Sequence, residues 1–571
     1  MTIDDKIKEL QRQYKILHVV DLDPWHDEPI FLKLNWLHNT ISQVYKEAYG
    51  PNERIIFTLT RGDIYESADA VAGQLITHFQ QQLNKIDVGN FFVILLTNDS
   101  VNIPVACDWA HNNISADPVP FTCIPIGDQL VEKTVESCIK NASLGGEYNS
   151  LIPLKISMDQ LDDKEKYLLT KSPTFCMYPW IHLHAYPTGA AYPCCQAEMA
   201  YPVGDCRNNS LEEIWNGDPM KQIRQKMLTD RPVSACTRCY EQENSGFFSG
   251  RQSANKHHGH HINTVAETQP DGTLDKFALT YWDIRFSNLC NLSCRSCGHI
   301  FSSSWYADQV KLAGKEWQEK NKVLNYAGRT ETDIWEQLVP HLDYVEQIYF
   351  AGGEPLMMKE HYNILDELER RGRFDVRLIY NTNFTHVKLK DRLVFDYWKK
   401  FDSVAVGASL DAMGPRAEYI RKGTDWDQIE HNREQMLKIC PEVDFYISPT
   451  LSIMNAWHLP DFHRNWIDKG YIRPQDLNVN ILQDPTHYRI DIAPPKYKQR
   501  LRLKFEEHIE WLRPLDQLRR ATVGFESAIN FMLGTDNTVL LSKFWKKTHE
   551  LDAIRKENIL EVIPELEAIQ L

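Results

Sequence analysis

Short apolar runs alternate with amphipathic segments over two long parts of the chain. In the first part, strand-like runs occur at 15–20, 54–59 and 91–96, and apolar residues recur at helical spacing over 63–83. This alternation is typical of a small α/β domain with parallel strands, which we place at residues 1–165. The segment has no glycine-rich phosphate-binding motif, and its role is not assigned.

The second part, 276–495, contains a longer series of the same kind. Its six candidate strands are 278–286, 345–350, 376–380, 403–408, 444–451 and 477–482. Helical patterns lie between them, for example over 358–372 and 425–437. Repeated βα units predict a parallel sheet or partial (β/α)6 barrel whose site lies at the carboxyl ends of the strands. The charged tail, 496–571, is predicted to form packing or interaction helices.

The intervening segment, 170–245, has a different pattern. WIHLHAYPTGAAYPCC predicts a β-hairpin with a Pro-Thr-Gly turn and a return strand ending at Cys194. Ser210-Leu-Glu-Glu213 is a capping box that begins a helix, and Asp218-Pro219 predicts the cap and first residue of another. The polar residues 240–275 predict a linker. The KHHGHH run within it favours a solvated loop, with metal binding as the alternative.

Composition is that of an ordinary globular protein. The 571 residues are 43% hydrophobic and 25% charged, with a formal net charge of −15. No apolar run approaches the ~18 residues of a membrane span, and the N-terminal residues lack an apolar signal core, so a cytoplasmic location is expected. The acidic balance disfavours a broad nucleic-acid surface.

The cysteines are unevenly distributed. Nine of the 13 lie between Cys176 and Cys297. Clustered thiols in a chain without a leader favour metal binding or redox chemistry over disulfides. The scattered Cys107, Cys123 and Cys138 are expected to be buried structural thiols, as is Cys440 at a helix end. Asp21 and Asp23 favour a polar exit from a strand, with metal binding as the alternative.

The most specific motif is C-x3-C-x2-C, formed by Cys290, Cys294 and Cys297 directly after the first strand of the second series. Zinc sites and ordinary electron-transfer clusters take four protein ligands, so three adjacent thiols leave one coordination position for another molecule. A zinc knuckle that borrows His299 is the structural alternative.

This arrangement resembles the signature of the radical S-adenosylmethionine (SAM) superfamily. The resemblance implies that the three thiolates hold three irons of a 4Fe–4S cluster, while the methionine moiety of SAM binds the fourth iron. It further implies reductive cleavage of SAM to a 5′-deoxyadenosyl radical that takes a hydrogen atom from substrate. The cofactors would then carry the chemistry while the barrel supplies position and shielding.

Further residues resemble the SAM-binding positions of that superfamily. AGGEP at the end of the second strand resembles its GGEP motif: Gly352 and Gly353 permit close backbone approach, and Glu354 can accept a charge-assisted bond from an ammonium group. The resemblance adds four polar residues from later strands: Asn383, Ser409, Asp411 and Arg421. The aromatic residue that many members carry before the third cysteine is Ser296 here, with Phe301 as a nearby substitute.

The 170–245 segment resembles a twitch or SPASM auxiliary cluster domain. Its pattern is Cys176, Gly189, Cys194 and then Cys236 and Cys239 in C-x2-C. The resemblance implies that the four thiolates ligate a second 4Fe–4S cluster. Such domains usually follow the barrel, whereas this one precedes it. Four thiolates also suit zinc.

The two cysteines left over in this segment, Cys195 and Cys206, could replace a ligand, act as a catalytic thiol or be structural.

Family members with such domains mostly modify peptides or proteins. The first hypothesis is therefore a peptide- or protein-modifying radical SAM enzyme, supplied with electrons by a flavodoxin or ferredoxin, with the N-terminal domain holding substrate or a partner. The second is a radical SAM dehydrogenase or rearrangement enzyme acting on a sugar or cofactor precursor. The third is a non-catalytic metal–thiolate interaction protein. The sequence identifies no catalytic side chain.

Overall fold

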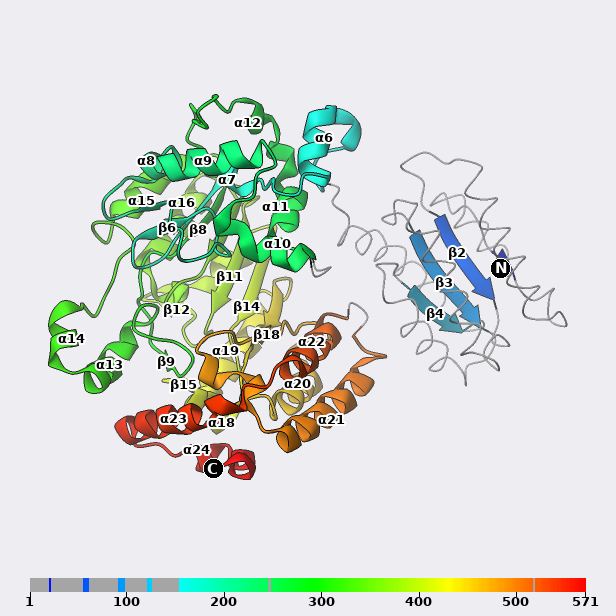
Figure 1. Cartoon of the computed structure of the whole chain (residues 1–571), viewed down its shortest axis with the longest axis vertical. Helices are drawn as coiled ribbons and strands as arrows, with labels where there is room; N and C mark the ends of the chain where they lie inside the picture. The colour runs from blue at the N-terminus through cyan, green and yellow to red at the C-terminus, as the bar shows by residue number, and fades with distance from the viewer. Residues whose placement is uncertain are drawn as a thin grey trace. The chain divides into compact units, whose positions relative to one another are not determined.

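The chain forms two compact units, Met1–Ser172 with Gly246–His260 and Pro173–Ser245 with His261–Leu571 (Figure 1). The computed structural model describes residues 153–244, 248–516 and 519–570, together with four strands nearer the N-terminus. The four domain boundaries expected from the sequence stay predictions.

The first unit contains a parallel four-stranded sheet. Its strands, in sheet order, are β1 (Val20–Asp21), β2 (Ile55–Thr60), β3 (Phe91–Thr97) and β4 (Phe121–Pro125). The strands predicted at 54–59 and 91–96 are therefore confirmed. The predicted helix at 63–83 and residues Asp23, Cys107 and Cys138 lie outside the described part. Helices α6 (Asp163–Thr170) and α11 (Gly250–His258) also belong to this unit.

The second unit is organised around an eight-stranded sheet in the order β16-β14-β11-β10-β8-β5-β6-β7. The first six strands of that order run parallel, β6 is antiparallel to β5, and β7 is antiparallel to β6. Their bounds are β5 (His182–Ala185), β6 (Ala190–Tyr192), β7 (Gly204–Asp205), β8 (Tyr281–Ile284), β10 (Gln347–Phe350), β11 (Arg377–Thr382), β14 (Val404–Ala408) and β16 (Asp444–Ile447). The predicted α/β class with a large parallel sheet is confirmed.

The last predicted strand, 477–482, is shorter and set apart. Its core, β18 (Asn480–Ile481), pairs in parallel with β17 (Thr450–Leu451) in a two-stranded sheet. A single bridge between Leu477 and Ile447 connects it to the end of β16.

The hairpin of the cysteine-rich segment belongs to the same sheet, which the sequence did not predict. β5 runs parallel to β8, with His184 opposite Asp283 and Leu183 opposite Trp282. The hairpin itself was predicted, although its return strand β6 ends at Tyr192, two residues before Cys194. The backbone hydrogen bonds of the β5–β8 pair therefore join the cysteine-rich segment to the first βα strand.

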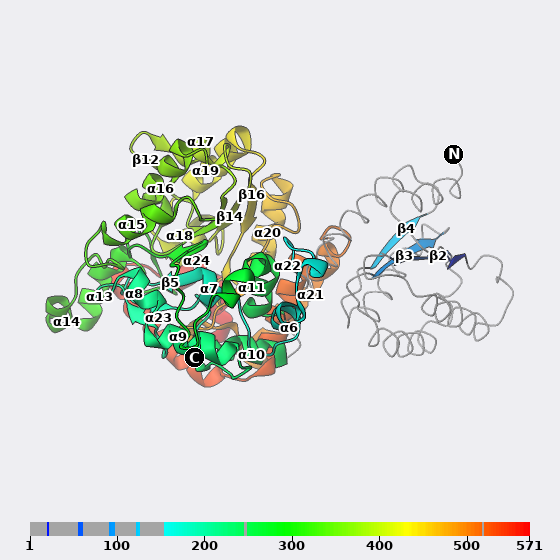
Figure 2. The same ribbon diagram turned by 90° about the horizontal axis from the view of Figure 1, so that it is seen from above.

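Helices cover one face of this sheet. In Figure 2, α15 (Asp333–Leu338), α16 (Lys359–Arg370), α17 (Val394–Trp398), α19 (Trp426–Ile439) and α20 (Leu459–Asp468) lie around the outside of the strands. Buried rings make the contact: Phe350 with His361 of α16 (4.7 Å between centroids) and Tyr380 with Trp398 of α17 (5.0 Å). Successive side chains of a strand point to opposite faces of the sheet. The strand residues next to Phe350 and Tyr380 in sequence therefore point to the face away from these helices.

The remaining elements complete the second unit. Its other helices are α7 (Tyr178–Ile181), α8 (Leu211–Trp215), α9 (Asp218–Met227), α10 (Thr237–Asn244), α12 (Asn263–Ala266), α13 (Tyr306–Ala313), α14 (Lys315–Lys320), α18 (Gly414–Ile420), α21 (Pro495–Leu512), α22 (Arg520–Gly534), α23 (Leu541–Arg555) and α24 (Ile559–Val562). The short strands are β9 (Ser293–Cys294), β12 (Lys388–Leu389), β13 (Arg392–Leu393) and β15 (Arg421–Lys422). The tail predicted to be helical is confirmed by α21 to α24.

Helix starts follow the predicted chemistry with one exception. Ser210 and Glu213 form the expected reciprocal capping box at α8. At α9, Gly217 is the cap and Asp218 is already the first helical residue, with Pro219 second. Pro is equally acceptable at both early positions because the first amides have no partner within the helix.

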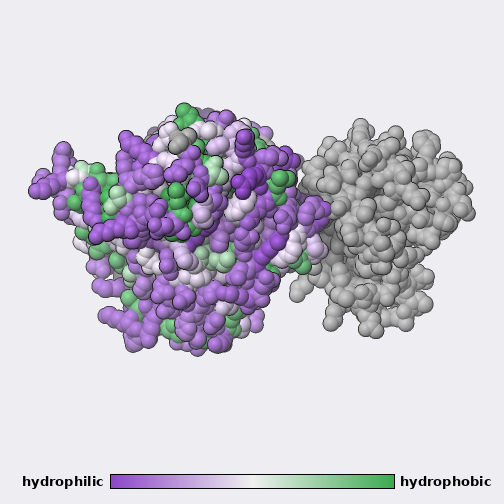
Figure 3. All heavy atoms as spheres, turned by 90° about the horizontal axis from the view of Figure 1, so that it is seen from below, coloured by the Kyte–Doolittle hydropathy of each residue, from purple (hydrophilic) through white to green (hydrophobic). Residues whose placement is uncertain are grey.

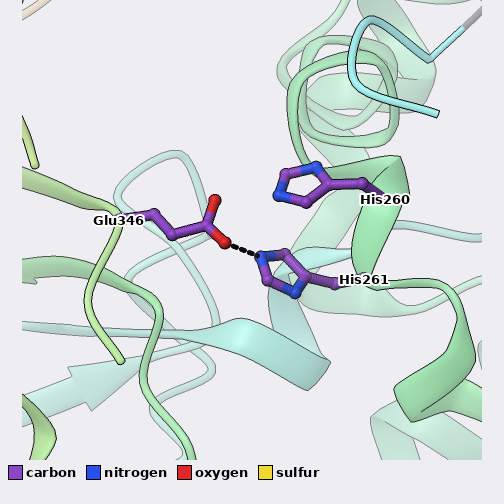
Figure 4. Close-up of side chains that lie close together, drawn as sticks. All are labelled: His260, His261 and Glu346. Carbon is purple, nitrogen blue, oxygen red and sulfur yellow. Dashed lines mark ion pairs between the residues drawn. The ribbon is translucent and has the colours of Figure 1, made fainter. Parts of the chain in front are cut away.

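The predicted linker at 240–275 is wrong for most of its length. A capping box of Ser249 and Gln252 begins α11, and Lys256 and His258 within the KHHGHH run are buried rather than solvated. In the second unit, His261 forms an ion pair with Glu346 (Nε2–Oε1 3.1 Å; Figure 4). Composition misled here because polar side chains in this stretch make specific buried contacts.

On the face seen in Figure 3, the described residues are mostly hydrophilic. Large exposed apolar side chains such as Ile300, Val523 and Val539 occur. On the face seen in Figure 3, hydrophobic areas are separated by hydrophilic ones. Within the described residues, no helix combines the length and the apolar composition needed to cross a membrane.

Two histidines are buried together between α20 and α21. His463 Nδ1 lies 3.0 Å from His508 Nε2, and Arg464 donates from Nε to His508 Nδ1 (3.2 Å). Since His508 Nδ1 accepts, its proton is on Nε2 and is donated to His463. Burial lowers the pKa of His463 to about 3 and that of His508 to about 2. Both rings are therefore neutral in the folded protein.

We expect this pair to make stability depend on pH. Below the ordinary histidine pKa of ~6.5 the unfolded chain takes up protons that the folded protein cannot, so the unfolding free energy falls as pH drops, by up to ~1.4 kcal/mol per unit for each ring. Urea unfolding at a series of pH values from neutral to mildly acidic measures the slope. A His463→Leu/His508→Phe variant should show a shallower slope than wild type; equal slopes would contradict this assignment.

Candidate metal and cofactor site

The three cysteines lie in the loop that follows β8, residues 285–297, which we call the motif loop. Cys290, Cys294 and Cys297 cluster around the buried Leu292. The loop is at the carboxyl end of β8, where a parallel sheet places its site.

Side chains directly after the motif donate hydrogen bonds to backbone carbonyls of the motif loop. Ser303 and Ser304 donate to the Cys290 carbonyl (3.1 and 2.8 Å), and Ser302 donates to the Leu292 carbonyl (2.5 Å). Trp305 Nε1 donates to the Cys294 carbonyl (2.8 Å). The SSSW run was not recognised from the sequence, although a group of hydroxyl residues directly after a metal motif is the signal that would have found it.

The electrostatics of the loop favour a positively charged ligand. Burial, together with neighbouring Cys294, raises the pKa of Cys290 and of Cys297 to about 12. Burial also raises the pKa of Cys294, an effect opposed by the Arg421 guanidinium. Metal ligation requires thiolates, and three thiolates so enclosed are compatible only with cations among them. The donor set therefore fits an iron–sulfur cluster or another thiophilic metal.

Glu354 is a fully buried carboxylate beside this loop. Its oxygens accept hydrogen bonds from Leu356 N (3.0 Å), Thr382 Oγ1 (2.7 Å) and Asn383 N (2.7 Å). Burial raises the pKa of Glu354 to about 7, while these bonds act in the opposite direction. Three donors fix the carboxylate in one orientation, so it is a preformed acceptor for a cationic group.

The two glycines before Glu354 permit a close crossing of two chain segments. Glu354 N donates to the Leu289 carbonyl at 2.7 Å. A Cβ on Gly353 would lie 2.2 Å from that same carbonyl oxygen. Gly352 has φ of +126°, a conformation that residues with a side chain rarely adopt. The GGE segment thus packs directly against the backbone of the motif loop.

Asn383 connects β11 to the motif loop. Its Nδ2 donates to Asn291 Oδ1 (2.9 Å) and lies 3.9 Å from Cys290 Sγ. Its Oδ1 accepts from the amide and hydroxyl of Thr385 (3.0 and 2.7 Å). Ser409, half-buried after β14, donates its amide to the Thr382 carbonyl (2.7 Å), which places it next to the end of β11.

Asp411 and Arg421 form a bidentate ion pair at the loop. Arg421 Nε and Nη2 lie 2.8 and 3.0 Å from the carboxylate oxygens of Asp411, which is fully buried. Arg421 Nη1 lies 3.6 Å from Cys294 Sγ, and β15 pairs with β9 so that Arg421 is opposite Cys294. The carboxylate that Arg421 pairs with in this structure is therefore that of Asp411. Pairing with a SAM carboxylate stays a prediction.

The residues predicted around SAM therefore converge on one end of the sheet. Glu354, Asn383, Arg421 and Asp411 lie within one or two contacts of the motif loop. Phe301, the suggested aromatic substitute, lies edge-on to Tyr186 of the hairpin turn (5.6 Å between centroids). The sequence placed these residues at strand ends, and the parallel sheet brings them together.

The second set of cysteines is also close-packed. Burial raises the pKa of Cys194, and the neighbouring charges of Cys195, Cys176 and Cys239 raise it further. Cys236 ends a short 3-10 turn (Ser234–Cys236) and Cys239 lies in α10, three residues on, where helical geometry puts both on one side.

A glycine makes the hairpin turn of this second set possible. Gly189 has φ of +86°, and a Cβ there would lie 2.4 Å from an Asp205 carboxylate oxygen.

The two leftover cysteines have different neighbours. Burial and the nearby Asp283 raise the pKa of Cys195 to about 12. Burial and the nearby Asp205 raise the pKa of Cys206 to about 12. Cys206 is fully buried, whereas Cys195 keeps an exposed surface. Cys195 therefore faces a polar cluster that sequence reasoning missed.

That cluster is part of the sheet face opposite the helices. We define the open face by Asp283, Tyr349, Asn381 and Tyr446, on four of the parallel strands. The last three are half-buried, whereas the strand residues between them are fully buried under the helices. Gly407 makes room on this face, because a Cβ there would lie 2.9 Å from Asn381 Oδ1 and 3.0 Å from the Tyr446 hydroxyl.

Asp283 is the charged centre of the open face. It is fully buried, with His184 Nδ1 at 2.9 Å and Arg285 Nε at 3.5 Å. Although burial alone would raise it, His184 and Arg285 lower the pKa of Asp283 to about 2. The Arg285 guanidinium also lies over the Tyr186 ring at 5.2 Å. A polar site with a fixed negative charge therefore occupies the sheet between β5 and β10.

Comparison with known proteins supports part of this assignment. Residues 176–240 match SPASM, an iron–sulfur cluster-binding domain. The match spans Cys176, Cys194, Cys236 and Cys239, so the SPASM-type iron–sulfur segment predicted within 170–245 is confirmed. A search of curated proteins found no match.

Two solved structures are similar to parts of this chain. "Native anSMEcpe with bound AdoMet" has 20% identity and a TM-score of 0.29, covering 44% of this chain and 66% of that one. "Native anSMEcpe with bound AdoMet and Cp18Cys peptide" has 17% identity and a TM-score of 0.26, covering 44% of this chain and 65% of that one. This chain thus matches just under two thirds of their length, and similarity at these scores carries no argument.

We expect Gly353→Ala to destabilise the motif loop. The new methyl group would overlap a backbone oxygen that cannot rotate away, which costs about 1–3 kcal/mol of unfolding free energy. Gly298→Ala is the matched control, because a Cβ there has nothing within 4 Å and the residue follows Cys297 directly. Urea midpoints of both variants and wild type measure the effect. Equal midpoints would show that the loop and the GGE segment are not in contact.

Proposed function

We propose that the protein is a radical SAM enzyme that acts on a peptide or protein. The observation that carries the proposal is the convergence of three enclosed thiols with Glu354, Asn383 and the Asp411–Arg421 pair at the carboxyl end of a parallel sheet. A zinc knuckle explains the thiols but not the preformed acceptor beside them. A site for a cationic, amino-acid-bearing cosubstrate explains both.

The residues of this site have distinct proposed roles. Cys290, Cys294 and Cys297 would hold three irons of a 4Fe–4S cluster and leave one iron for SAM. Glu354 would accept hydrogen bonds from the SAM ammonium group, since its carboxyl group is buried and already oriented by three donors, and a nearby cation would favour its charged form. A reduced cluster with SAM supplies a 5′-deoxyadenosyl radical for hydrogen-atom abstraction, and a flavodoxin- or ferredoxin-type protein would supply the electron.

The open face is the proposed place for substrate. Strand directions put the motif loop at the carboxyl end of β8 and Cys194, beyond the return strand β6, toward the amino end of β5. Asp283 and His184 lie between these ends. Substrate on this face would therefore contact the site of radical formation on one side and the SPASM segment on the other.

A peptide or protein substrate is proposed because of the resemblance to family members with such auxiliary domains. A sugar or cofactor precursor is the alternative. The role of the 1–165 segment in holding substrate or partner, and the second 4Fe–4S cluster on Cys176, Cys194, Cys236 and Cys239, belong to the same proposal.

Iron analysis after anaerobic reconstitution tests the cluster assignment. We expect about eight irons per chain in wild type and about four in Cys290→Ala/Cys294→Ala/Cys297→Ala, as two 4Fe–4S clusters require. The mutant should also lose reductive cleavage of SAM to 5′-deoxyadenosine. The matched control replaces Cys176, Cys194, Cys236 and Cys239 by Ala and should keep about four irons. Absence of iron from wild type would overturn the proposal.

Deuterium transfer separates the two substrate classes. The enzyme, SAM and a reductant are incubated with a deuterium-labelled cell extract that has been divided into macromolecular and small-molecule fractions. We expect deuterium in 5′-deoxyadenosine from the macromolecular fraction, and prior protease digestion of that fraction should reduce it. Transfer from the small-molecule fraction alone would favour the sugar or cofactor-precursor alternative.

A further inference from the structure

Arg295, a spacer residue between the second and third cysteines of the motif, is directed away from the cysteines into the protein. Its side chain is fully buried, and the guanidinium lies 3.7 Å above the Tyr419 ring. Nη2 contacts Asp552 (2.5 Å) and Glu557 (2.6 Å). Both acids belong to the C-terminal extension, more than 250 residues along the chain.

A second arginine makes the reverse connection. Arg555, the last residue of α23, donates from Nη2 to the Ser293 carbonyl (2.8 Å) and from Nε to Asp308 (2.9 Å). Its side chain is 1% exposed, and its guanidinium lies over the Trp305 ring at 4.8 Å. Trp305 in turn donates to the Cys294 carbonyl. Arg555 therefore contacts the motif loop both directly and through one further side chain.

The two acids also reach the strand that carries Arg421. Asp552 accepts from the Tyr419 hydroxyl (2.8 Å) and from Ile559 N (3.0 Å). Glu557 pairs with Lys422 of β15 at 2.6 Å. Because β15 pairs with β9, the four residues Arg295, Asp552, Arg555 and Glu557 hold both strands at this end of the site. We call these four residues the C-terminal clamp.

We infer that the C-terminal clamp positions the cluster-binding cysteines, so that α23 and the turn after it are part of the cofactor site. The inference rests on the proposed function for the identity of the bound group. The positioning itself is inferred from the contacts that the C-terminal clamp makes with Ser293, Lys422 and Trp305.

The chemistry of the contacts argues against simple packing. Burying a guanidinium and two carboxylates costs more than packing apolar side chains of the same volume, so these charges contribute little net stability by themselves. They do fix direction, since a planar guanidinium bonds only at set angles. The contacts of Arg555, Asp552 and Glu557 with Ser293, Arg295 and Lys422 lie next to Cys294 and Arg421 in the chain. The clamp therefore acts on geometry at the thiols.

Arg555→Met tests this, since it removes the guanidinium, with its hydrogen bonds and its contact with the Trp305 ring, but keeps an unbranched apolar side chain. Arg555→Lys is the conservative variant: it keeps the positive charge, but its single nitrogen replaces the two nitrogens that contact Asp308 and the Ser293 carbonyl. The matched control is Arg416→Met: Arg416 pairs with Glu565 (Nη2–Oε2 3.0 Å) and also anchors the C-terminal extension to the sheet unit, but at α18 rather than at the motif loop. Hydrogen exchange of the 291–299 segment and the electron paramagnetic resonance spectrum of the reduced, reconstituted protein are measured for each.

We expect Arg555→Met to speed exchange of the 291–299 segment by about tenfold or more, the ratio for one lost charge-assisted hydrogen bond. It should also change the electron paramagnetic resonance signal of the cluster at the motif loop, which is the signal that Cys290→Ala/Cys294→Ala/Cys297→Ala lacks. The signal of the SPASM cluster should stay the same. Arg555→Lys should be intermediate and Arg416→Met close to wild type. Identical behaviour of Arg555→Met and Arg416→Met, or an unchanged segment in Arg555→Met, would overturn the inference.

The two proposals fail in different ways. Exchange of the 291–299 segment in iron-free protein does not depend on a cluster, so it decides whether the clamp holds the loop. If wild type binds no iron at the motif loop, the proposed function fails while the exchange result still stands. Should Arg555→Met not fold, Glu557→Gln, whose side chain is 15% exposed, carries the same comparison with a smaller expected change.

Discussion

Compensation of buried charge is the constraint on which the second unit depends. The motif loop collects three thiols that cannot ionise together without cations, and every charged group around it has a specific partner: Glu354 takes three hydrogen bonds, Asp411 takes Arg421, and Arg295 takes Asp552 and Glu557. A buried charge left without a partner would cost several kcal/mol. The fold at this end of the sheet is therefore determined by pairing as much as by apolar contact.

The β5–β8 pair gives the unit its second organising feature. It makes the SPASM segment and the βα series one continuous sheet, although the paired residues, such as His182 and Tyr281, are 99 positions apart along the chain. Asp283 and His184 face each other across this pair. The polar centre of the open face therefore exists only because the two segments are joined, since each contributes one half of the ion pair.

The sequence predicted the elements better than their contacts. Strand positions followed from apolar runs, which depend on local chemistry, while the resemblance to a known superfamily pointed to the three cysteines, Glu354 and Asn383. The β5–β8 pairing, the Asp283 cluster and the partners of Arg295 could not be found in this way. Arg295 is an unremarkable spacer in the sequence, and Asp552 lies in a helix whose polar pattern looks like a solvated face. Long-range pairs carry no local signal. The polar 240–275 stretch is a different case, because the capping box of Ser249 and Gln252 is a local signal that the polar composition obscured.

The position of β5 has a topological consequence. A strand has two hydrogen-bonding edges, and both edges of β8 are occupied, one by β10 and the other by β5. The strands at the far side of the sheet therefore cannot pair with β8 to close a ring. β6 and β7, each antiparallel to its neighbour, extend the sheet beyond β5. The sheet therefore ends at β16 on one side and continues into the SPASM hairpin on the other, instead of closing on itself.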